Sequence, residues 1–266
     1  YGPSIEAFKK LINNNVKLIF TVDCGTLSFE AIDYAKEKKI DVIVLDHHQS
    51  EIKLPNAYSI INPNRLDDNS QLNYLCAAGV TFMFLISLNR ELRLLNWFEK
   101  KKINEPNLIE YLDLVSLGTV CDVVPLTGLN RAIVKQGLRI LKTNKNLGLK
   151  TLIDICGINS HPSVYHLGYV LGPRINAGGR VGKSSHGANL LINNNPKEVF
   201  KIAQELDHFN KERKYLEEDV LKKILKDSIN KSSDPVLILS GENWHEGVIG
   251  IVAARLKDKF NKPTII

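Results

Sequence analysis

The motif Asp46-His47-His48 directly follows the apolar run Asp41–Leu45, and Asp23 stands in the same relation to the earlier run Lys17–Val22. Short β-branched runs of this kind predict buried strands of a parallel sheet. Ligands of open α/β sheets bind at the carboxyl ends of such strands. We therefore expect these carboxylates and imidazoles to meet in one crevice. That set of groups suits a divalent metal such as Mn²⁺, Fe²⁺ or Zn²⁺, and it predicts a metal-dependent hydrolase.

A third carboxylate, Asp122, lies among apolar residues, with Cys121 before it and Val123 after it. We expect the preceding helix, which begins at Leu108, to end at Gly118. A buried carboxylate needs a partner or a metal, although an aspartate here could instead cap a helix. We favour the metal, because Asp23 and the two histidines require a further ligand. Two charges about 4 Å apart repel by roughly 4 kcal/mol at an effective dielectric of 20, and a divalent ion reverses the sign of that term.

The segment Gly172–Arg180 predicts an anion-binding site. Its glycines allow a phosphate to approach the backbone closely, and Arg174 and Arg180 offer forked donors. Asn176 lies between the two arginines and adds a polar side chain. A Gly-Gly-Arg sequence alone would indicate a turn, so the phosphate interpretation rests on the two arginines and the asparagine together.

A second anion-binding segment is expected at residues 240–255. A strand should end at Leu239 and a helix should begin near Gly247, so that the helix N-terminus and His245 collect phosphate oxygens. Trp244 is interpreted equally well as a residue that stacks on a base or as a core aromatic. Gly250 is expected to allow close helix packing.

The spacing of apolar residues predicts the elements that position these groups. Residues 4–62 alternate helix and strand, with a helix from a Ser4 cap to Leu11, a helix from Thr26 or Ser28 to Lys38, and a third strand at 58–61. This alternation predicts right-handed crossovers and a parallel sheet, hence an α/β fold with flanking helices. The run Leu75–Leu88 is apolar on nearly every side and predicts a helix buried in the core. Another helix is expected over roughly 131–141.

The second half of the chain changes character at Asn195. Asn195-Pro196 is a favourable helix start, and helical spacing continues almost to Ser232, a helix of about 35 residues that far exceeds the mean length. Its polar centre, Asn210–Arg213, suits a helix that joins two domains. We expect a first domain at 1–194, a connecting helix at 195–233, and the start of a second α/β domain at 234–266, beginning with a strand at 236–239.

Bulk composition agrees with a globular protein. The net charge of +6 is compatible with a polyanionic partner, although solvated lysines on helix faces explain it equally well. No apolar run is long enough to span a bilayer. The four cysteines are widely scattered, which favours reduced thiols in the cytoplasm, and Cys24 and Cys121 are expected to be packing residues rather than metal ligands.

Taken together, the motifs resemble the DHH phosphoesterase family and, within it, the RecJ-type exonucleases specific for single strands. The resemblance covers nearly the whole chain in the family's own order. The matching segments are Thr21–Gly25, Leu45–His48, Ile61–Pro63, Gly118–Leu126, Gly172–Arg180, Asn210 with Arg213, and Trp244–Leu256.

The resemblance implies the roles of several residues. Asp23, His47, His48 and Asp122 would hold the metal, and Asp46 would orient the histidine turn. Arg174 and Arg180, together with His245 and Arg255 of the DHH-associated domain, would hold substrate phosphates. The implied activity is Mn²⁺- or Mg²⁺-dependent hydrolysis of single-stranded DNA from the 5′ end to 5′-mononucleotides, with two divalent ions, in DNA repair and recombination.

Cys121 and Gly178 stand where the family usually has alanine, and no Asp-x-Asp motif precedes Asp23. That motif is expected upstream of Tyr1, and the rest of the DHH-associated domain and an oligonucleotide-binding fold are expected downstream. This segment alone is therefore expected to bind metal poorly and to hydrolyse little.

Two alternatives to an exonuclease stay open. One is a DHH phosphodiesterase acting on cyclic dinucleotides or short RNA, although its usual Gly-Gly-Gly-His motif is replaced here by Trp244–Gly247. The other is an inactive DHH scaffold protein, although such proteins typically lose their ligand residues. The expected partners are single-stranded DNA and, among proteins, a single-strand-binding protein or a helicase. A monomer in the cytoplasm, with no membrane association, is expected.

Overall fold

The structure, a computed structural model, describes residues 2–143, 145–230 and 233–266, with side chains throughout except at 226–230. It divides into two compact units, Tyr1–Thr143 and Asn144–Ile266. The sequence predicts domain boundaries at 194 and 233, whereas the two compact units divide the chain between Thr143 and Asn144. The predicted domain boundaries stay a prediction.

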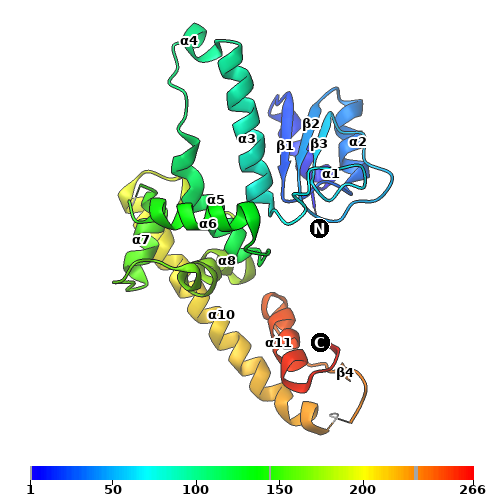
Figure 1. Cartoon of the computed structure of the whole chain (residues 1–266). Coiled ribbons are helices and arrows are strands. Elements are labelled where there is room, and N and C mark those ends of the chain that lie inside the picture. The colour runs from blue at the N-terminus through cyan, green and yellow to red at the C-terminus, as the bar shows by residue number, and fades with distance from the viewer. Residues whose placement is uncertain (1, 144, 231–232) are drawn as a thin grey trace. The chain divides into compact units, whose positions relative to one another are not determined.

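The first unit joins a small sheet to a group of helices (Figure 1). Its elements in chain order are α1 (Ile5–Asn13), β1 (Leu18–Val22), α2 (Phe29–Glu37), β2 (Asp41–Leu45), β3 (Ser59–Ile61), α3 (Ala77–Leu94), α4 (Trp97–Lys101), the 3₁₀ turn η1 (Leu108–Tyr111), α5 (Leu112–Cys121) and α6 (Gly128–Leu141).

The three strands form a parallel sheet in the order β1-β2-β3, which confirms the prediction. Leu18 pairs with Asp41 and Val22 with Leu45, so β1 and β2 end at the same level. One face of the sheet packs with α1 and α2 in a core of Phe8, Ile19, Ala31, Ile32, Ala35, Val42, Val44 and Ile60. The predicted Ser4 cap is also present, because its hydroxyl accepts a hydrogen bond from the Ala7 amide at 3.2 Å.

The opposite face of β1 is more exposed than it would be in a strand covered by helices on both faces. Leu18, Phe20 and Val22 are 44–55% exposed, and Phe20 meets α3 through the ring of Phe84 at 5.9 Å. The prediction of a fully buried α3 is wrong in its second half: its first turns are buried, whereas Leu85, Ile86 and Leu88 are half-exposed. Apolar residues on every side of a helix thus do not guarantee neighbours on every side. Within the described residues no helix, α3 included, combines the length and apolarity needed to cross a membrane.

Gly118 does not end a helix, contrary to the prediction, because α5 continues to Cys121. A Cβ atom at Gly118 would lie 2.8 Å from the Cβ atom of Ala78. Real Cβ atoms do not approach so closely, so glycine is needed where α5 crosses α3. The helix therefore delivers Asp122 as its C-terminal cap residue instead of leaving it on a loop.

The second unit is built around one long helix. Its elements are α7 (Leu147–Ile155), the π-helical turn η2 (His166–Leu171), α8 (Gly172–Val181), α9 (His186–Ile192), α10 (Pro196–Asn230), β4 (Leu237–Ile238), α11 (Glu246–Phe260) and β5 (Thr264–Ile265). The 35 residues of α10 confirm the predicted long helix, although its predicted end near Ser232 lies outside the described residues. β4 and β5 pair in parallel, and the end of α10 packs with them and with α11 through Val220, Ile224, Leu237, Leu239, Val248, Val252 and Leu256.

Candidate metal centre

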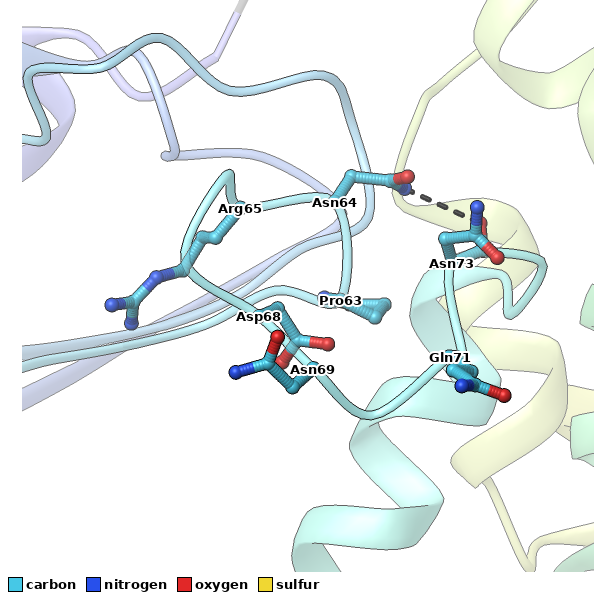
Figure 2. A pocket seen from close by; sticks show the side chains of 7 residues that line it. All are labelled: Pro63, Asn64, Arg65, Asp68, Asn69, Gln71 and Asn73. Atoms are coloured by element: carbon cyan, nitrogen blue, oxygen red, sulfur yellow. Dashed lines mark hydrogen bonds between the residues drawn. The ribbon is translucent and has the colours of Figure 1, made fainter.

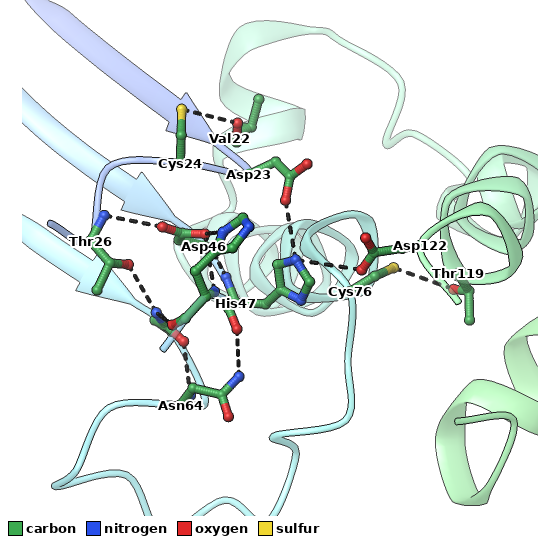
Figure 3. A network of polar contacts seen from close by, with 12 residues as sticks. Val22, Asp23, Cys24, Thr26, Asp46, His47, Asn64, Cys76, Thr119 and Asp122 are labelled. Atoms are coloured by element: carbon green, nitrogen blue, oxygen red, sulfur yellow. Dashed lines mark hydrogen bonds and ion pairs between the residues drawn. The ribbon is translucent and has the colours of Figure 1, made fainter. Parts of the chain in front are cut away.

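Asp23, the Asp46–His48 turn and Asp122 meet at the carboxyl edge of the sheet (Figure 3). Asp23 follows β1, the turn follows β2, and Asp122 caps α5. Asp23 has a φ of 62° and Val123, directly after Asp122, a φ of 58°. Residues with side chains rarely adopt this left-handed region, and such residues cluster at functional sites. The backbone is therefore unusual on both sides of the crevice.

His47 lies between two carboxylates that are remote in sequence. Its Nε2 atom is 3.2 Å from Asp23 Oδ1 and 3.4 Å from Asp122 Oδ2. The His47 side chain is 14% exposed, whereas those of Asp23 and Asp122 are 55% and 38% exposed. The expected convergence of these three residues is present, and the site opens to solvent on the carboxylate side.

Asp46 is buried and fixes the histidine turn. Its carboxylate accepts hydrogen bonds from the amides of Thr26 at 3.0 Å, His47 at 2.8 Å and His48 at 3.3 Å, and it pairs with His48 Nδ1 at 2.7 Å. Burial by itself would raise the pKa of Asp46, but the hydrogen bonds from His48, Thr26 and His47 outweigh it and lower the pKa to about 2. Asp46 is thus an anion at neutral pH, in the orienting position that the resemblance implies.

Asn62 and Asn64 complete the turn, and their roles were not predicted from the sequence. Asn62 Nδ2 donates to Thr26 Oγ1 and to the His48 carbonyl, both at 2.9 Å, and Asn64 Nδ2 donates to the His47 carbonyl at 2.5 Å. Both residues follow β3, so polar residues behind the third strand were the signal that could have found them. Thr26 proves to be part of this network, and Ser28 is the residue at the start of α2.

A polar pocket of about 520 Å³ adjoins Asn64 (Figure 2). It lies in the loop that was expected at residues 65–73. Its lining consists of Pro63, Asn64, Arg65, Asp68, Asn69, Gln71 and Asn73. Asn64 links this loop to the histidine turn, because it also donates to the Asn73 carbonyl at 3.4 Å.

The donor set fits a divalent cation. Asp23, His47 and His48 each offer one ligand atom, and these atoms lie within 4.8 Å of one another; Asp122 adjoins them through His47. His48 is held at Nδ1 by Asp46, the arrangement in which a carboxylate orients an imidazole toward a metal with its other nitrogen. Burial raises the pKa of Asp122; His47 and His48 act in the opposite direction, and the charge of Asp23 adds to the rise. A cation would relieve that repulsion.

The nearby cysteines behave as packing residues, in line with the expectation. Burial, with nearby Asp46 and Asp23, raises the pKa of Cys24, and burial, with Asp122 and Cys76, raises the pKa of Cys121 to about 11. Cys76 Sγ contacts Thr119 Oγ1 at 3.5 Å. The thiols of Cys24 and Cys121 are thus less acidic than a free cysteine, and the group of candidate ligands found among the described residues consists of Asp23, His47 and His48.

The first predicted anion-binding segment is a helix, α8, so its backbone amides are engaged in helical hydrogen bonds. Arg174 is held internally, with Nε 2.8 Å from Asp207 Oδ1 and Nη1 donating to the Val170 carbonyl. Arg180 is exposed, and Asn176 lies on the same helix; Arg180 Nη1 donates to the Gly247 carbonyl at 3.1 Å. Arg180 therefore contacts the start of α11, whereas Arg174 is largely committed to Asp207.

The second predicted segment folds as expected into a turn followed by α11, but with different details. His245 Nδ1 accepts a hydrogen bond from the Gly247 amide at 3.0 Å and so caps the helix itself. Trp244 is partly buried against the core of this unit, which favours the core interpretation over base stacking. The packing role predicted for Gly250 is wrong, because a Cβ atom there would meet nothing within 4 Å. Arg255 pairs with Glu217 at 2.5 Å.

Comparison with known proteins agrees with this geometry. The profile described as "DHH family, N-terminal domain" matches residues 3–119. The single-stranded-DNA-specific exonuclease RecJ of Salmonella typhimurium is 39% identical and that of Escherichia coli 38% identical, each over 100% of this chain and 47% of the relative. The chain thus spans about half the length of the curated relatives it matches.

The solved structures that resemble this chain are also RecJ proteins. A crystal structure of exonuclease RecJ bound to manganese has a TM-score of 0.84 at 30% identity, covering 99% of this chain and 64% of the other. A structure of RecJ from Thermus thermophilus in complex with Mn²⁺ has a TM-score of 0.83 at 29% identity, covering 98% and 37%. Residues 3–119 thus match the N-terminal domain of the DHH family, and the chain is similar to RecJ proteins over its whole length.

Proposed function

We propose that the protein is a metal-dependent exonuclease that hydrolyses single-stranded DNA from the 5′ end to 5′-mononucleotides, with Mn²⁺ or Mg²⁺. The observation that carries the proposal is the convergence of Asp23 and Asp122 on His47, beside a histidine anchored by a buried aspartate. Relatives named single-stranded-DNA-specific exonucleases support it, as do the structures of RecJ from Thermus thermophilus in complex with Mn²⁺ and with Mg²⁺.

The residues would divide the work as follows. Asp23, His47, His48 and Asp122 would hold the metal, and Asp46 would keep the two histidines in place. A bound divalent cation lowers the pKa of a water and neutralises phosphate charge. Arg180, Arg255, His245 and Asn176 would supply phosphate contacts. Arg174, paired with Asp207, would support α8 while offering its remaining donors.

The test is hydrolysis of a long single-stranded oligonucleotide by the full-length protein. Chelation should abolish turnover and Mn²⁺ should restore it. Asp122→Asn and Asp23→Asn should each reduce turnover by more than about 100-fold, because orienting residues around a metal already cost 10- to 100-fold. Asp33→Asn, at an exposed aspartate of α2, is the matched control and should leave turnover unchanged.

Other outcomes would redirect the proposal. A preference for dinucleotides over long single-stranded DNA would end the exonuclease assignment. Binding of DNA without metal-dependent hydrolysis would indicate a scaffold protein. Turnover unchanged by Asp122→Asn would remove that residue from the site. The cytoplasmic location and the monomeric state belong to the same proposal.

A further inference from the structure

Glu217 is an acidic residue buried inside the second unit, with 1% of its side chain exposed. It lies on α10 and faces two arginines, one from the same helix and one from α11. Burial of an ionised carboxylate is costly unless it is paired. The two arginines that contact Glu217 therefore compensate the buried negative charge.

Each oxygen of Glu217 contacts a different arginine. Arg213 Nη1 donates to Oε2 at 2.7 Å, and Arg213 also donates from Nε and Nη2 to Asn210 Oδ1, at 3.3 and 3.0 Å. Arg255 Nε lies 2.5 Å from Oε1, as an ion pair without the alignment of a full hydrogen bond. The Arg213 side chain is 12% exposed and the Arg255 side chain 55% exposed. Glu217 thus holds Arg255 at Nε, while more than half of the Arg255 side chain is exposed.

Positive charge exceeds negative charge in this cluster. Burial lowers the pKa of Arg213; Glu217 opposes this change, and Arg180 and Arg255 add to the lowering. Arg180 and Arg255 thus both act on Arg213, which is paired with a single carboxylate. Arg180 in addition reaches the first turn of α11 through the Gly247 carbonyl. An excess of guanidinium groups over carboxylates suits a phosphate group.

We propose that Glu217, whose other oxygen is held by Arg213, is a positioning residue that orients Arg255 toward a phosphate of single-stranded DNA. The inference rests on the function proposed above and deepens it. Because Glu217 uses Nε of Arg255, the planar guanidinium can offer Nη1 and Nη2 together to one phosphate. A free arginine loses side-chain entropy on binding, and anchoring removes part of that cost.

The sign of a neutralising substitution separates positioning from plain electrostatics. Glu217→Gln removes a negative charge, so electrostatics alone predicts tighter binding of a polyanion. Loss of positioning predicts weaker binding. Glu218 is the next residue of the same helix and is exposed, so Glu218→Gln is a matched control with the same change in charge.

The experiment measures binding of a fluorescein-labelled single-stranded oligonucleotide to the full-length protein by anisotropy, with chelator present to prevent hydrolysis. Glu217→Gln should weaken binding about 5- to 20-fold, which corresponds to about 1–2 kcal/mol, and Glu218→Gln should bind as well as the wild type or better. Glu217→Gln should weaken binding little further in an Arg255→Gln background, because the two residues act together. With metal present, Glu217→Gln should raise KM more than it lowers kcat.

Arg255→Lys keeps the charge at an exposed position and tests the same idea if Glu217→Gln fails to fold. It should weaken binding almost as much as Arg255→Gln, because a lysine lacks the fork. Binding by Glu217→Gln equal to that of Glu218→Gln, or by Arg255→Lys equal to the wild type, would overturn the positioning role alone. A wild-type protein that does not bind the oligonucleotide would overturn both this inference and the proposed function.

Discussion

Replacing Asp46 with asparagine tests whether one buried carboxylate holds the histidine turn in place. Asparagine has the same shape but no charge, and one of its two terminal atoms is a donor. The carboxylate accepts from three backbone amides and from His48 Nδ1. Asp46→Asn would therefore turn a donor group toward at least one of these N–H groups.

The magnitude follows from the pKa of about 2, against an ordinary value of 3.8. A tenfold change in an acid dissociation constant corresponds to about 1.4 kcal/mol, so the ionised form contributes about 2 kcal/mol to the stability at neutral pH. The mismatched donor adds a cost of about 1–2 kcal/mol. We expect Asp46→Asn to lower the free energy of unfolding by about 2–4 kcal/mol at pH 7.

The pH dependence has a fixed sign. Because the pKa is lower in the folded state, the contribution is fully present above about pH 4 and is lost as the pH falls toward 2. The difference between wild type and Asp46→Asn should shrink over that window, to less than about 1 kcal/mol from the charge itself near pH 2. His48 gives a second readout, because the hydrogen bond with Asp46 raises its pKa; the pKa of His48 should fall in the variant.

Urea unfolding monitored by circular dichroism, at pH 7 and at steps down to pH 2, measures the stability, and NMR titration measures the pKa of His48. Chelator keeps the protein free of metal, and Asp33→Asn is the control. Equal stability of Asp46→Asn and wild type at pH 7, or a difference that does not change with pH, would refute the reasoning.

Further predictions follow from the packing. Gly118→Ala should destabilise the protein by about 1–3 kcal/mol through its overlap with Ala78, whereas Gly250→Ala, in open space on α11, should stabilise by about 0.5–1 kcal/mol; thermal and urea unfolding measure both, and equal effects would contradict the packing at Gly118. Asn62→Ala should cost about 1–3 kcal/mol because it leaves Thr26 and the His48 carbonyl without its two hydrogen bonds; unchanged urea unfolding would contradict it. Trp244→Phe should retain most affinity for single-stranded DNA if the ring is a core residue, and a loss of more than about tenfold in anisotropy would restore the stacking interpretation.

The geometry of the candidate metal centre was largely predictable because it depends on strand ends. Apolar runs located β1 and β2, and a parallel sheet places the residues after such runs at one edge. Asp122 was harder, since it reaches the site from the end of a helix that was expected to stop at Gly118. A glycine inside a helix and a glycine that ends one look alike in sequence, and the difference here is the contact with Ala78.

The structures of the two predicted anion-binding segments were less predictable in detail. Glycines and arginines in Gly172–Arg180 indicated a phosphate loop, but the chain forms α8, and Arg174 is committed to Asp207, a residue 33 positions away. Side-chain partners across such separations leave no local signal. The same is true of Glu217, because its proposed positioning role follows only from its burial between Arg213 and Arg255.

The left-handed backbone at Asp23 limits which residues that position can accept. A library of all substitutions there, sorted first for folding and then for turnover, should divide into two groups. Asparagine and glycine tolerate this conformation and should give folded protein without activity, whereas valine, isoleucine and threonine should be lost at the folding step. The proposed role in the metal site would thus restrict this position twice, by the torsion of the main chain and by the need for a negative oxygen, and aspartate satisfies both.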